Sequence, residues 1–311
     1  MTKPRHLVSV ADFDLGDIDR VYRIAAATKT QIAMGIRTQA LAGRSLAMIF
    51  EKPSMRTRVS FETAMIQAGG AALYIRGEEI GLGKRESVKD VASVMSRFVD
   101  AIMIRTFAHK NVEDLARYSR VPVINGLSDY EHPCQALADL FTVLEKLGTF
   151  GGVRMTFVGD GNNVARSLAL LCLRLGVGFT LTCPAGHEFD EPFLKAVRKL
   201  FGPKAALRTV RNPHQAVKGA HVIYTDVWAS MGQEAEAAER KKEFQPYQVN
   251  RELMRHAPKD ALVMHCLPAH RGDEITDGVI DSPNSVVYDQ AENRLHVQKG
   301  ILFYLLGIAA R

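Results

Sequence analysis

The sequence predicts an α/β protein with two doubly wound parallel-sheet domains. The chain has 311 residues, more than one compact core usually holds, which makes two domains the expectation. Short apolar runs alternate with amphipathic stretches along the whole length, the pattern of parallel strands joined by helices. Glycines in the segment Gly148–Gly152 interrupt this alternation. We therefore expect domains at 1–148 and 149–295, with a last helix at 296–311 that returns to the first domain.

The first domain is expected to hold four strands separated by helices. Apolar residues recur with helical spacing over Ile18–Ala42. The helix that follows the first strand ends at Gly69-Gly70, a typical stop signal. The strands are expected at Leu46–Phe50, Ala72–Ile75, Ala101–Ile104 and Val121–Ile124, and further helices at Val88–Val99 and from Pro133 to Leu147.

The second domain repeats the alternation. Its first strand is expected at Val153–Val158, and a helix follows over Asn162–Leu175. Further strands are expected at Phe179–Thr182, Val222–Tyr224, Leu262–Met264 and Val286–Tyr288, before the final apolar helix, His296–Ala310. In both domains the carboxyl ends of the strands should meet at one sheet edge, where open α/β sheets bind ligands.

Composition excludes several classes of protein. The hydrophobic fraction of 47% and the charged fraction of 24% are typical of a soluble globular protein. Apolar runs are too short to span a bilayer, and the N-terminus lacks the apolar core of a secretory signal, so we expect a cytoplasmic protein. The four cysteines have no metal-ligand spacing and are expected to be reduced. The net charge of +6 suits an anionic small substrate, and the basic residues form no run that favours nucleic acid.

An anion site is predicted where the first strand leads into a helix, at Ser54-Met55-Arg56-Thr57-Arg58. Free N–H groups and the positive helix end attract an anion there, and hydroxyl and guanidinium groups complete a phosphate cradle. The alternative is that Ser54 only caps the helix while Arg56 and Arg58 face solvent. Two hydroxyls and two arginines within five residues favour phosphate.

Polar residues follow other strands of the first domain. Arg105 comes at the end of the third strand, and His132 and Gln135 lie at the start of the helix after the fourth. A lone histidine at a helix start is more often a cap or a surface residue. Three polar loops that converge on one sheet edge favour a ligand site instead.

A glycine turn, Gly159-Asp160-Gly161, offers a rival interpretation, a dinucleotide site. Such a site needs a third glycine and a carboxylate at the end of the next strand. Val164 occupies the position of the third glycine, and Cys183 stands where the carboxylate belongs. We therefore expect no nicotinamide dinucleotide here, and interpret the turn as one that exposes Asn163.

Two further strand ends in the second domain carry reactive groups. Asp226 could hold an ammonium group, and Ser230-Met231-Gly232 could form a closing loop with a glycine hinge. Cys266 follows His265, with His270 as a second candidate base. Three interpretations of the thiol remain open: a small buried residue, a nucleophile, or a group that orients an incoming amine without forming a bond.

The order and combination of these motifs closely resemble the aspartate/ornithine carbamoyltransferase family over essentially the whole chain. Ser230-Met231-Gly232 and His265-Cys266-Leu267-Pro268 resemble its ornithine branch. The resemblance implies transfer of the carbamoyl group of carbamoyl phosphate to the side-chain amine of L-ornithine, giving L-citrulline and phosphate. It implies a first domain that binds carbamoyl phosphate, a second that binds ornithine, and an active site in the cleft between them.

By this resemblance, two sets of residues would bind the substrates. Carbamoyl phosphate would be held by Ser54, Met55 (through its backbone), Arg56, Thr57, Arg105, His132, Gln135 and Arg294. Ornithine would be held by Asn163, Asp226, Ser230, Met231, Cys266 and the carbonyl of Leu267. The catalytic residues would be Arg105, His132, Asp226 and Cys266. The resemblance implies no metal and no cofactor.

The resemblance also implies a homotrimer with sites at the subunit interfaces and domain closure on substrate binding. Two positions depart from the family pattern. Met55 stands where threonine is common, which is harmless if only its backbone is used. Residues 78–85 lack the glutamine that relatives often supply to the neighbouring subunit's phosphate site, and Lys84 or Arg85 could replace it.

The implied mechanism is direct attack by the neutral side-chain amine on the carbamoyl carbon, with the oxyanion near Thr57, Arg105 and His132. Positioning and electrostatics would supply most of the acceleration, and activity should rise with pH as the amine loses its proton. The alternatives are a dehydrogenase, a nucleic-acid-binding module and a carbamoyltransferase for another amine. A catabolic, citrulline-degrading role is the alternative to arginine biosynthesis, which is the expectation.

Overall fold

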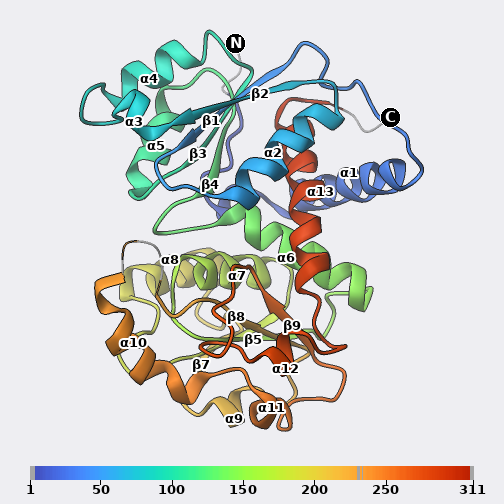
Figure 1. Cartoon of the computed structure of the whole chain (residues 1–311), viewed down its shortest axis with the longest axis vertical. Helices are drawn as coiled ribbons and strands as arrows, with labels where there is room; N and C mark the ends of the chain where they lie inside the picture. The colour runs from blue at the N-terminus through green and yellow to red at the C-terminus, as the bar shows by residue number, and fades with distance from the viewer. Residues whose placement is uncertain (1–3, 230–231, 233, 309–311) are drawn as a thin grey trace. The chain divides into compact units, whose positions relative to one another are not determined.

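The computed structural model describes residues 4–229, 232 and 234–308 (Figure 1). The chain divides into two compact units. The first comprises Met1–Phe141 with Glu292–Arg311, and the second comprises Thr142–Ala291. Both boundaries fall inside helices, α6 (Pro133–Leu147) and α13 (Val287–Leu305). Within these described residues, no helix has the length and apolar character needed to cross a membrane.

The first unit is built on a four-stranded parallel sheet with strand order β2-β1-β3-β4. The strands are β1 (Ser45–Phe50), β2 (Ala71–Arg76), β3 (Ala101–Arg105) and β4 (Val123–Leu127). β3 is buried along its whole length, whereas the edge strand β2 is partly exposed. This arrangement explains the continuous apolar run of β3, since a central parallel strand is covered on both faces. The expected strands are confirmed, with small shifts at their ends.

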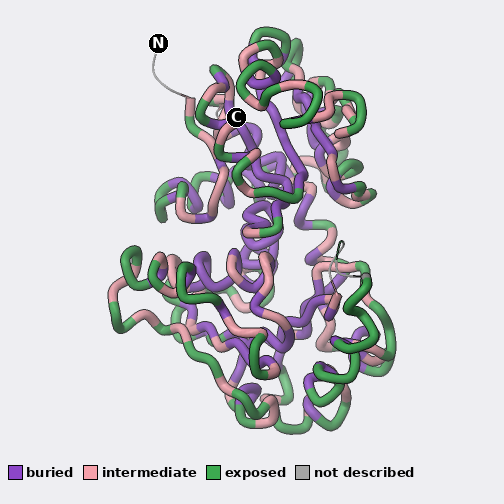
Figure 2. The backbone as a smooth tube through the Cα atoms, turned by 90° about the vertical axis from the view of Figure 1, so that its left-hand side faces the viewer, coloured by how far each residue is buried: buried purple, intermediate pink, exposed green. Residues whose placement is uncertain are grey.

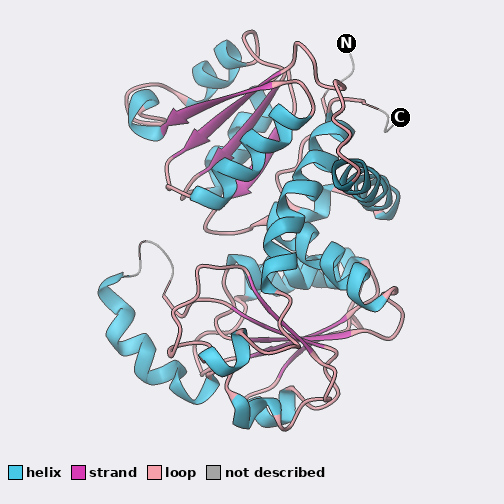
Figure 3. Cartoon of the chain, turned by 45° about the vertical axis from the view of Figure 1, so that its right-hand side comes forward, coloured by secondary structure: helices cyan, strands magenta, loops and turns pink. Residues whose placement is uncertain are grey.

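Helices flank both faces of this sheet (Figure 3). Besides α6 and α13, the helices of this unit are η1 (Val10–Asp12), α1 (Leu15–Ala33), α2 (Met55–Gln67), α3 (Gly77–Ile80), α4 (Val88–Met95) and α5 (His109–Tyr118). Asp14, Ser54 and Ser87 cap α1, α2 and α4 with their side chains, as their residue types favour. A buried apolar cluster joins α4 and α5 to one face of the sheet through residues such as Val91 and Leu115.

The second unit is built on a five-stranded parallel sheet with strand order β7-β6-β5-β8-β9. Its strands are β5 (Arg154–Val158), β6 (Gly178–Thr182), β7 (Leu207–Thr209), β8 (Val222–Thr225) and β9 (Leu262–His265). Its helices are α7 (Asn163–Arg174), α8 (Glu191–Phe201), α9 (Pro213–Ala216), η2 (Glu234–Glu236), α10 (Ala237–Phe244), η3 (Gln245–Tyr247), α11 (Arg251–Met254) and α12 (Asp277–Ile280). In each unit the buried residues follow the sheet and the exposed ones gather on outer loops and helix faces (Figure 2). The predicted fold class is confirmed.

One predicted strand is wrong, and two predicted helices have other bounds than expected. Val286–Tyr288 is not a strand: the Val286 N–H donates to the Val263 carbonyl at 3.0 Å, and the chain then enters α13 at Val287. The last helix therefore begins well before His296. The helical pattern expected over Ile18–Ala42 ends at Ala33, because Gly35 adopts a left-handed conformation (φ 75°) that stops the helix.

Candidate active site

The predicted anion motif lies at the start of α2, as expected. Ser54 is the N-cap, and its Oγ accepts a hydrogen bond from the Thr57 N–H at 3.3 Å. Thr57 is fully buried, Arg56 is half-buried, and the side chain of Met55 is exposed. The exposed Met55 side chain is consistent with a role for its backbone alone. The first turn of α2 carries no acidic side chain, so no carboxylate competes with an anion for its remaining N–H groups.

Arg294 connects this motif to α6 through two buried hydrogen bonds. Its Nη2 donates to Thr57 Oγ1 at 2.8 Å, and its Nη1 donates to Gln135 Oε1 at 2.5 Å. The Gln135 Nε2 group in turn donates to Asp139 Oδ1 at 2.7 Å. The three residues predicted from distant parts of the sequence therefore lie together within the first unit, and Asp139 joins them.

Arg105 and His132 complete the polar groups at this sheet edge. Both are buried, Arg105 at the end of β3 and His132 immediately before α6. Burial lowers the pKa of His132 well below its usual range, and the positive charges of Arg294 and Arg105 lower it further. His132 is therefore neutral near pH 7, with one ring N–H that can donate to an oxygen.

Three loops at this sheet edge are joined by contacts among Lys52, Asp129 and Phe107. Lys52 is buried after β1, forms an ion pair with Asp129 after β4, and lies 4.2 Å from the ring centroid of Phe107 after β3. The Asp129 N–H also donates to the Phe107 carbonyl at 2.9 Å. These contacts fix the loops that carry Ser54 and His132, and they were not predicted from the sequence.

In the second unit, Asp226 lies at the centre of a small polar cluster at the end of β8. Its Oδ1 accepts a hydrogen bond from the Cys266 thiol at 3.0 Å, and its Oδ2 accepts from Asn162 Nδ2 at 3.1 Å. Asn163 is the first residue of α7, next to Asn162. Ser230 and Met231 lie outside the described residues. The predicted Asp226 and Cys266 are thus in direct contact, whereas Asn162 was expected only at the start of the helix and not as a partner of Asp226.

His265 supports the turn at Leu267. The Leu267 N–H donates to His265 Nδ1 at 2.9 Å, so this nitrogen carries the lone pair, and the Nε2–H group faces Glu274 Oε1 at 3.0 Å. Leu267 has a left-handed backbone (φ 56°), which is uncommon for a side chain of its size. His270 contributes its backbone N–H to Glu274 at 2.6 Å. Because its lone pair is used by Leu267, His265 holds the turn rather than serving Cys266 as a base.

One group of described side chains has the composition of a metal site. Ligand atoms of Asp226, His265 and Cys266 lie within 4.8 Å of one another. Both nitrogens of His265 already take part in hydrogen bonds, to Leu267 and Glu274. Metal binding would break at least one of them, so the cluster as arranged suits an amine better than a cation that needs the imidazole lone pair.

The glycine turn before α7 does not offer a pyrophosphate site. Asn162 Oδ1 accepts hydrogen bonds from the N–H groups of Val164 and Ala165, both at 3.0 Å. Those are the groups that a dinucleotide would need. A Cβ added to Gly161 would lie 2.9 Å from the backbone N of Phe189, so this glycine serves the packing of the turn against a neighbouring loop.

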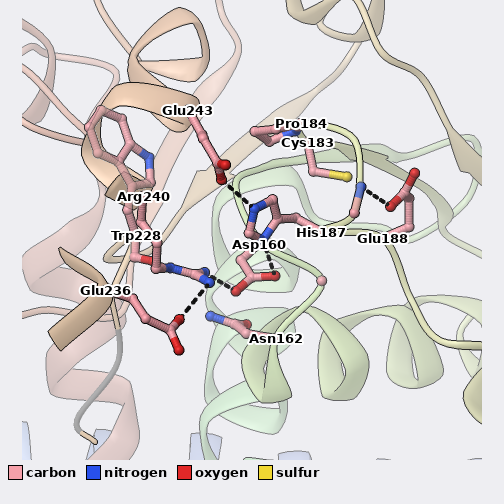
Figure 4. A network of polar contacts seen from close by, with 12 residues as sticks. Asp160, Asn162, Cys183, Pro184, His187, Glu188, Trp228, Glu236, Arg240 and Glu243 are labelled. Carbon is pink, nitrogen blue, oxygen red and sulfur yellow. Dashed lines mark hydrogen bonds and ion pairs between the residues drawn. The ribbon is translucent and has the colours of Figure 1, made fainter. Parts of the chain in front are cut away.

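A second polar network lies beside this turn (Figure 4). Arg240, buried on α10, forms an ion pair with Asp160 and a hydrogen bond from its Nε to the Trp228 carbonyl. His187 approaches Asp160 at 3.9 Å and contacts Glu243 at 2.8 Å (Figure 4). Asp160 is two residues before Asn162, and Trp228 is two residues after Asp226. Arg240 thus joins the two loops that supply the cluster around Asp226.

Comparisons with known proteins cover both units. Residues 5–145 match a family model described as the aspartate/ornithine carbamoyltransferase, carbamoyl-P binding domain, and residues 151–305 match its Asp/Orn binding domain. The ornithine carbamoyltransferase of Pyrococcus abyssi is 53% identical over 306 residues, 98% of this chain and 96% of the relative. The anabolic ornithine carbamoyltransferase of Pyrococcus furiosus is 53% identical over 304 residues, 97% of this chain and 96% of the relative.

Solved structures agree with these relatives. A structure of the ornithine carbamoyltransferase from Pyrococcus furiosus superposes with a TM-score of 0.94 at 52% identity, covering 99% of this chain and 98% of that one. The corresponding structure from Thermus thermophilus gives a TM-score of 0.86 at 40% identity, covering 98% of this chain and 100% of that one.

Proposed function

The chain belongs to the aspartate/ornithine carbamoyltransferase family, and on that premise we propose that it transfers the carbamoyl group of carbamoyl phosphate to the side-chain amine of L-ornithine. The products are L-citrulline and phosphate. Relatives named ornithine carbamoyltransferase, 53% identical over nearly the whole chain, support this substrate pair. The anabolic designation of one of them supports a role in arginine biosynthesis rather than in citrulline breakdown.

The observation that carries the proposal is the pair of hydrogen bonds from Arg294 to Thr57 and Gln135. They bring a guanidinium, a hydroxyl and an amide together at the N-terminal end of α2. In the proposed site, Ser54, the Met55 backbone, Arg56 and Thr57 hold the phosphate, because a helix N-terminus with arginines stabilises a dianion.

The carbamoyl group is assigned to Arg105, His132, Gln135 and Arg294. A neutral His132 donates one N–H toward the carbonyl oxygen, and the guanidinium of Arg105 adds positive charge there. When the amine attacks, negative charge grows on that oxygen, so these interactions strengthen in the transition state. Because the donors are already buried and fixed, little reorganisation is needed during the reaction.

Ornithine is assigned to the second unit, with Asn163, Asp226, Ser230, Met231, Cys266 and the Leu267 carbonyl as its partners. The Asp226 carboxylate accepts a hydrogen bond from the Cys266 thiol. The oxygens of this carboxylate can also accept a hydrogen bond from a protonated or a neutral amine. In this assignment Cys266 orients the amine and forms no covalent bond. The ammonium group first loses a proton to solvent, and the amine attacks as the free base. The proton that the attacking nitrogen then loses passes to the departing phosphate, which leaves as HPO4²⁻ into the positive site of the first unit.

A homotrimer in the cytoplasm is also proposed. Large exposed apolar side chains of the first unit, Val59 and Ile66 on α2, Leu73 on β2, and Val94 and Phe98 on and after α4, are the kind that subunit contacts cover. Four free cysteines suit a reducing compartment. Lys84 and Arg85, both exposed near α3, are candidates for a contact with a neighbouring subunit's phosphate site.

The proposal is tested by measuring citrulline and phosphate released from carbamoyl phosphate with four acceptors: ornithine, putrescine, aspartate and N-acetylornithine. Turnover with ornithine alone is expected. Turnover with another amine would agree with carbamoyl phosphate binding in the first unit and would contradict the assignment of ornithine to the second unit. If the folded chain releases no carbamoylated product with any of the four acceptors, the transferase proposal is wrong.

A further inference from the structure

Asp139 is a buried carboxylate that the proposed chemistry does not use directly. It lies one helical turn after Gln135 on α6, and both side chains are almost fully buried. Gln135 Nε2 donates to Asp139 Oδ1 at 2.7 Å, while Gln135 Oε1 accepts from Arg294 Nη1 at 2.5 Å. The amide of Gln135 therefore lies between a carboxyl oxygen on one side and a guanidinium group on the other.

These two partners allow the amide one orientation. An ionised carboxylate only accepts hydrogen bonds, so it must face the NH2 end of the amide. A guanidinium only donates, so it must face the carbonyl oxygen. Reversing the amide would set two donors against each other at Arg294 and two acceptors against each other at Asp139, inside a buried region where unmade hydrogen bonds are costly.

We infer that Asp139 is a positioning residue that fixes the amide of Gln135 so that its carbonyl oxygen faces the substrate, and thereby contributes to selection of a carbamoyl over an acetyl group. The inference rests on the proposed function. A carbonyl oxygen has two lone pairs, and Arg294 takes one of them. The second accepts an N–H of the carbamoyl NH2 group. An acetyl group carries CH3 at that place and has no proton to donate.

The position of Asp139 also affects Thr57 through the same chain of contacts. Arg294, held by the Gln135 oxygen, donates to Thr57 Oγ1 at 2.8 Å. A reversed amide would release the guanidinium from Gln135 and disturb its contact with Thr57. The effect of Asp139 should therefore appear in the binding of the carbamoyl group and in turnover, and not only in folding.

The test is the variant Asp139→Asn, which keeps the size of the side chain but replaces an acceptor with a group that accepts or donates. With ornithine saturating, kcat/KM is measured for carbamoyl phosphate, and the inhibition constant is measured for acetyl phosphate as a competitor. We expect kcat/KM to fall about tenfold, because the neutral amide of the variant can also turn its NH2 group toward Gln135 and so no longer excludes the reversed orientation. The inhibition constant of acetyl phosphate should change much less than kcat/KM for carbamoyl phosphate, since acetyl phosphate shares the contacts at Thr57 and Arg294 but has no N–H group for the Gln135 oxygen.

Three controls separate positioning from stability. Asp139→Glu keeps a carboxylate acceptor, so it should retain more of the preference for carbamoyl phosphate over acetyl phosphate than Asp139→Asn does. In a Gln135→Ala background, Asp139→Asn should cause no further loss, because its effect passes through the amide. Asp17→Asn removes another buried carboxylate, one that pairs with Arg5 in the same unit. It should lower the thermal midpoint without changing the ratio of carbamoyl to acetyl phosphate affinity.

Each outcome bears on a distinct statement. If the unmodified chain forms no citrulline, the proposed function fails, whatever Asp139 does. If that chain is active and Asp139→Asn keeps its discrimination, or loses affinity for both phosphates equally, the inference is overturned. Should Asp139→Asn fail to fold, Asp139→Ala removes the acceptor altogether and is judged by the same ratio.

Discussion

Arg56 and Cys266 represent the two kinds of group on which the proposed reaction depends, charge at the phosphate and orientation of the amine. Arg56→Ala is expected to lower kcat/KM for carbamoyl phosphate by about 10³-fold, because it removes a charge-assisted contact in the transition state. Cys266→Ser keeps a donor for Asp226 and should lose about tenfold or less. Steady-state measurement of kcat/KM for both variants gives the two losses.

The control for this comparison is Arg23→Ala, which removes an exposed arginine paired with Asp19 on α1 and should leave kinetics unchanged. Direct attack by the amine requires the loss at Arg56 to exceed the loss at Cys266 by a wide margin. Near-equal losses would instead favour a covalent role for the thiol.

Buried histidines predict how stability depends on pH. Burial lowers the pKa of His132, His109 and His296 below the ordinary value of 6.5. Below that value the unfolded chain binds protons that the folded chain does not, so the free energy of unfolding should fall as the pH drops from about 7 to about 5. Above pH 7 the histidines are neutral in both states and their effect disappears.

Urea unfolding at a series of pH values measures this dependence. His132→Gln removes one of the three groups, so its stability should fall less steeply between pH 7 and 5 than that of the unmodified chain. An unchanged slope in this variant would mean that the folded chain protonates His132 as readily as the unfolded chain does, against the lowered pKa of this buried ring.

At the level of helices and strands, periodicity predicted most of the fold. The buried strands were found because runs such as Ala101–Ile104 are apolar throughout, as central parallel strands are. The amphipathic helices α5 and α8 were not singled out, and the apolar run Val286–Tyr288 was assigned to a strand that continued the alternation of the second domain. Only the contact of Val286 with Val263, far away in sequence, determines that this segment turns into α13.

Close packing of α13 against α1 gives a prediction at this scale. A Cβ on Gly300 would lie 2.6 Å from the Val21 carbonyl oxygen, part of a backbone that cannot move aside. Gly300→Ala should therefore destabilise the chain by about 2 kcal/mol, although alanine favours helices over glycine. The thermal midpoint measures the change.

Gly278→Ala on α12 is the matched control. Its added Cβ would meet the guanidinium of Arg251, the end of an exposed and flexible side chain that can swing away. This substitution should be neutral or slightly stabilising. A neutral result at Gly300 as well would contradict the packing of α13 described above.

Arg240 makes α10 an element that serves the ornithine half of the site. It ties Asp160, near Asn162, to the Trp228 carbonyl, near Asp226 (Figure 4). Arg240→Ala should raise the KM for ornithine about tenfold or more through misplacement of Asp226, and change the KM for carbamoyl phosphate by less than about twofold. Lys241→Ala, at an exposed neighbour paired with Asp273, should change neither. Equal effects on both substrates would point to a general loss of structure.

For the molecule as a whole, the sequence made the candidate site residues visible more readily than the side chains that hold them in place. Ser54, Arg105, His132 and Asp226 follow strands or start helices, positions that a sequence makes visible. Asp139, Glu274, Lys52 and Arg240 act through partners that only the folded chain reveals. Asp139 alone had a local signal, its spacing of four residues from Gln135 on one helix.

In the proposed reaction the carbamoyl group passes directly from carbamoyl phosphate to the amine, and phosphate is released only when the amine attacks. The most direct test of this reaction is a rapid-mixing experiment. A known concentration of the chain is mixed with carbamoyl phosphate, first without and then with ornithine, and phosphate and citrulline are both measured on the timescale of one turnover. The account predicts no phosphate above the uncatalysed rate without ornithine, and equal amounts of phosphate and citrulline with it. A burst of phosphate equal to the enzyme concentration in the absence of ornithine would reveal a carbamoylated intermediate and contradict it.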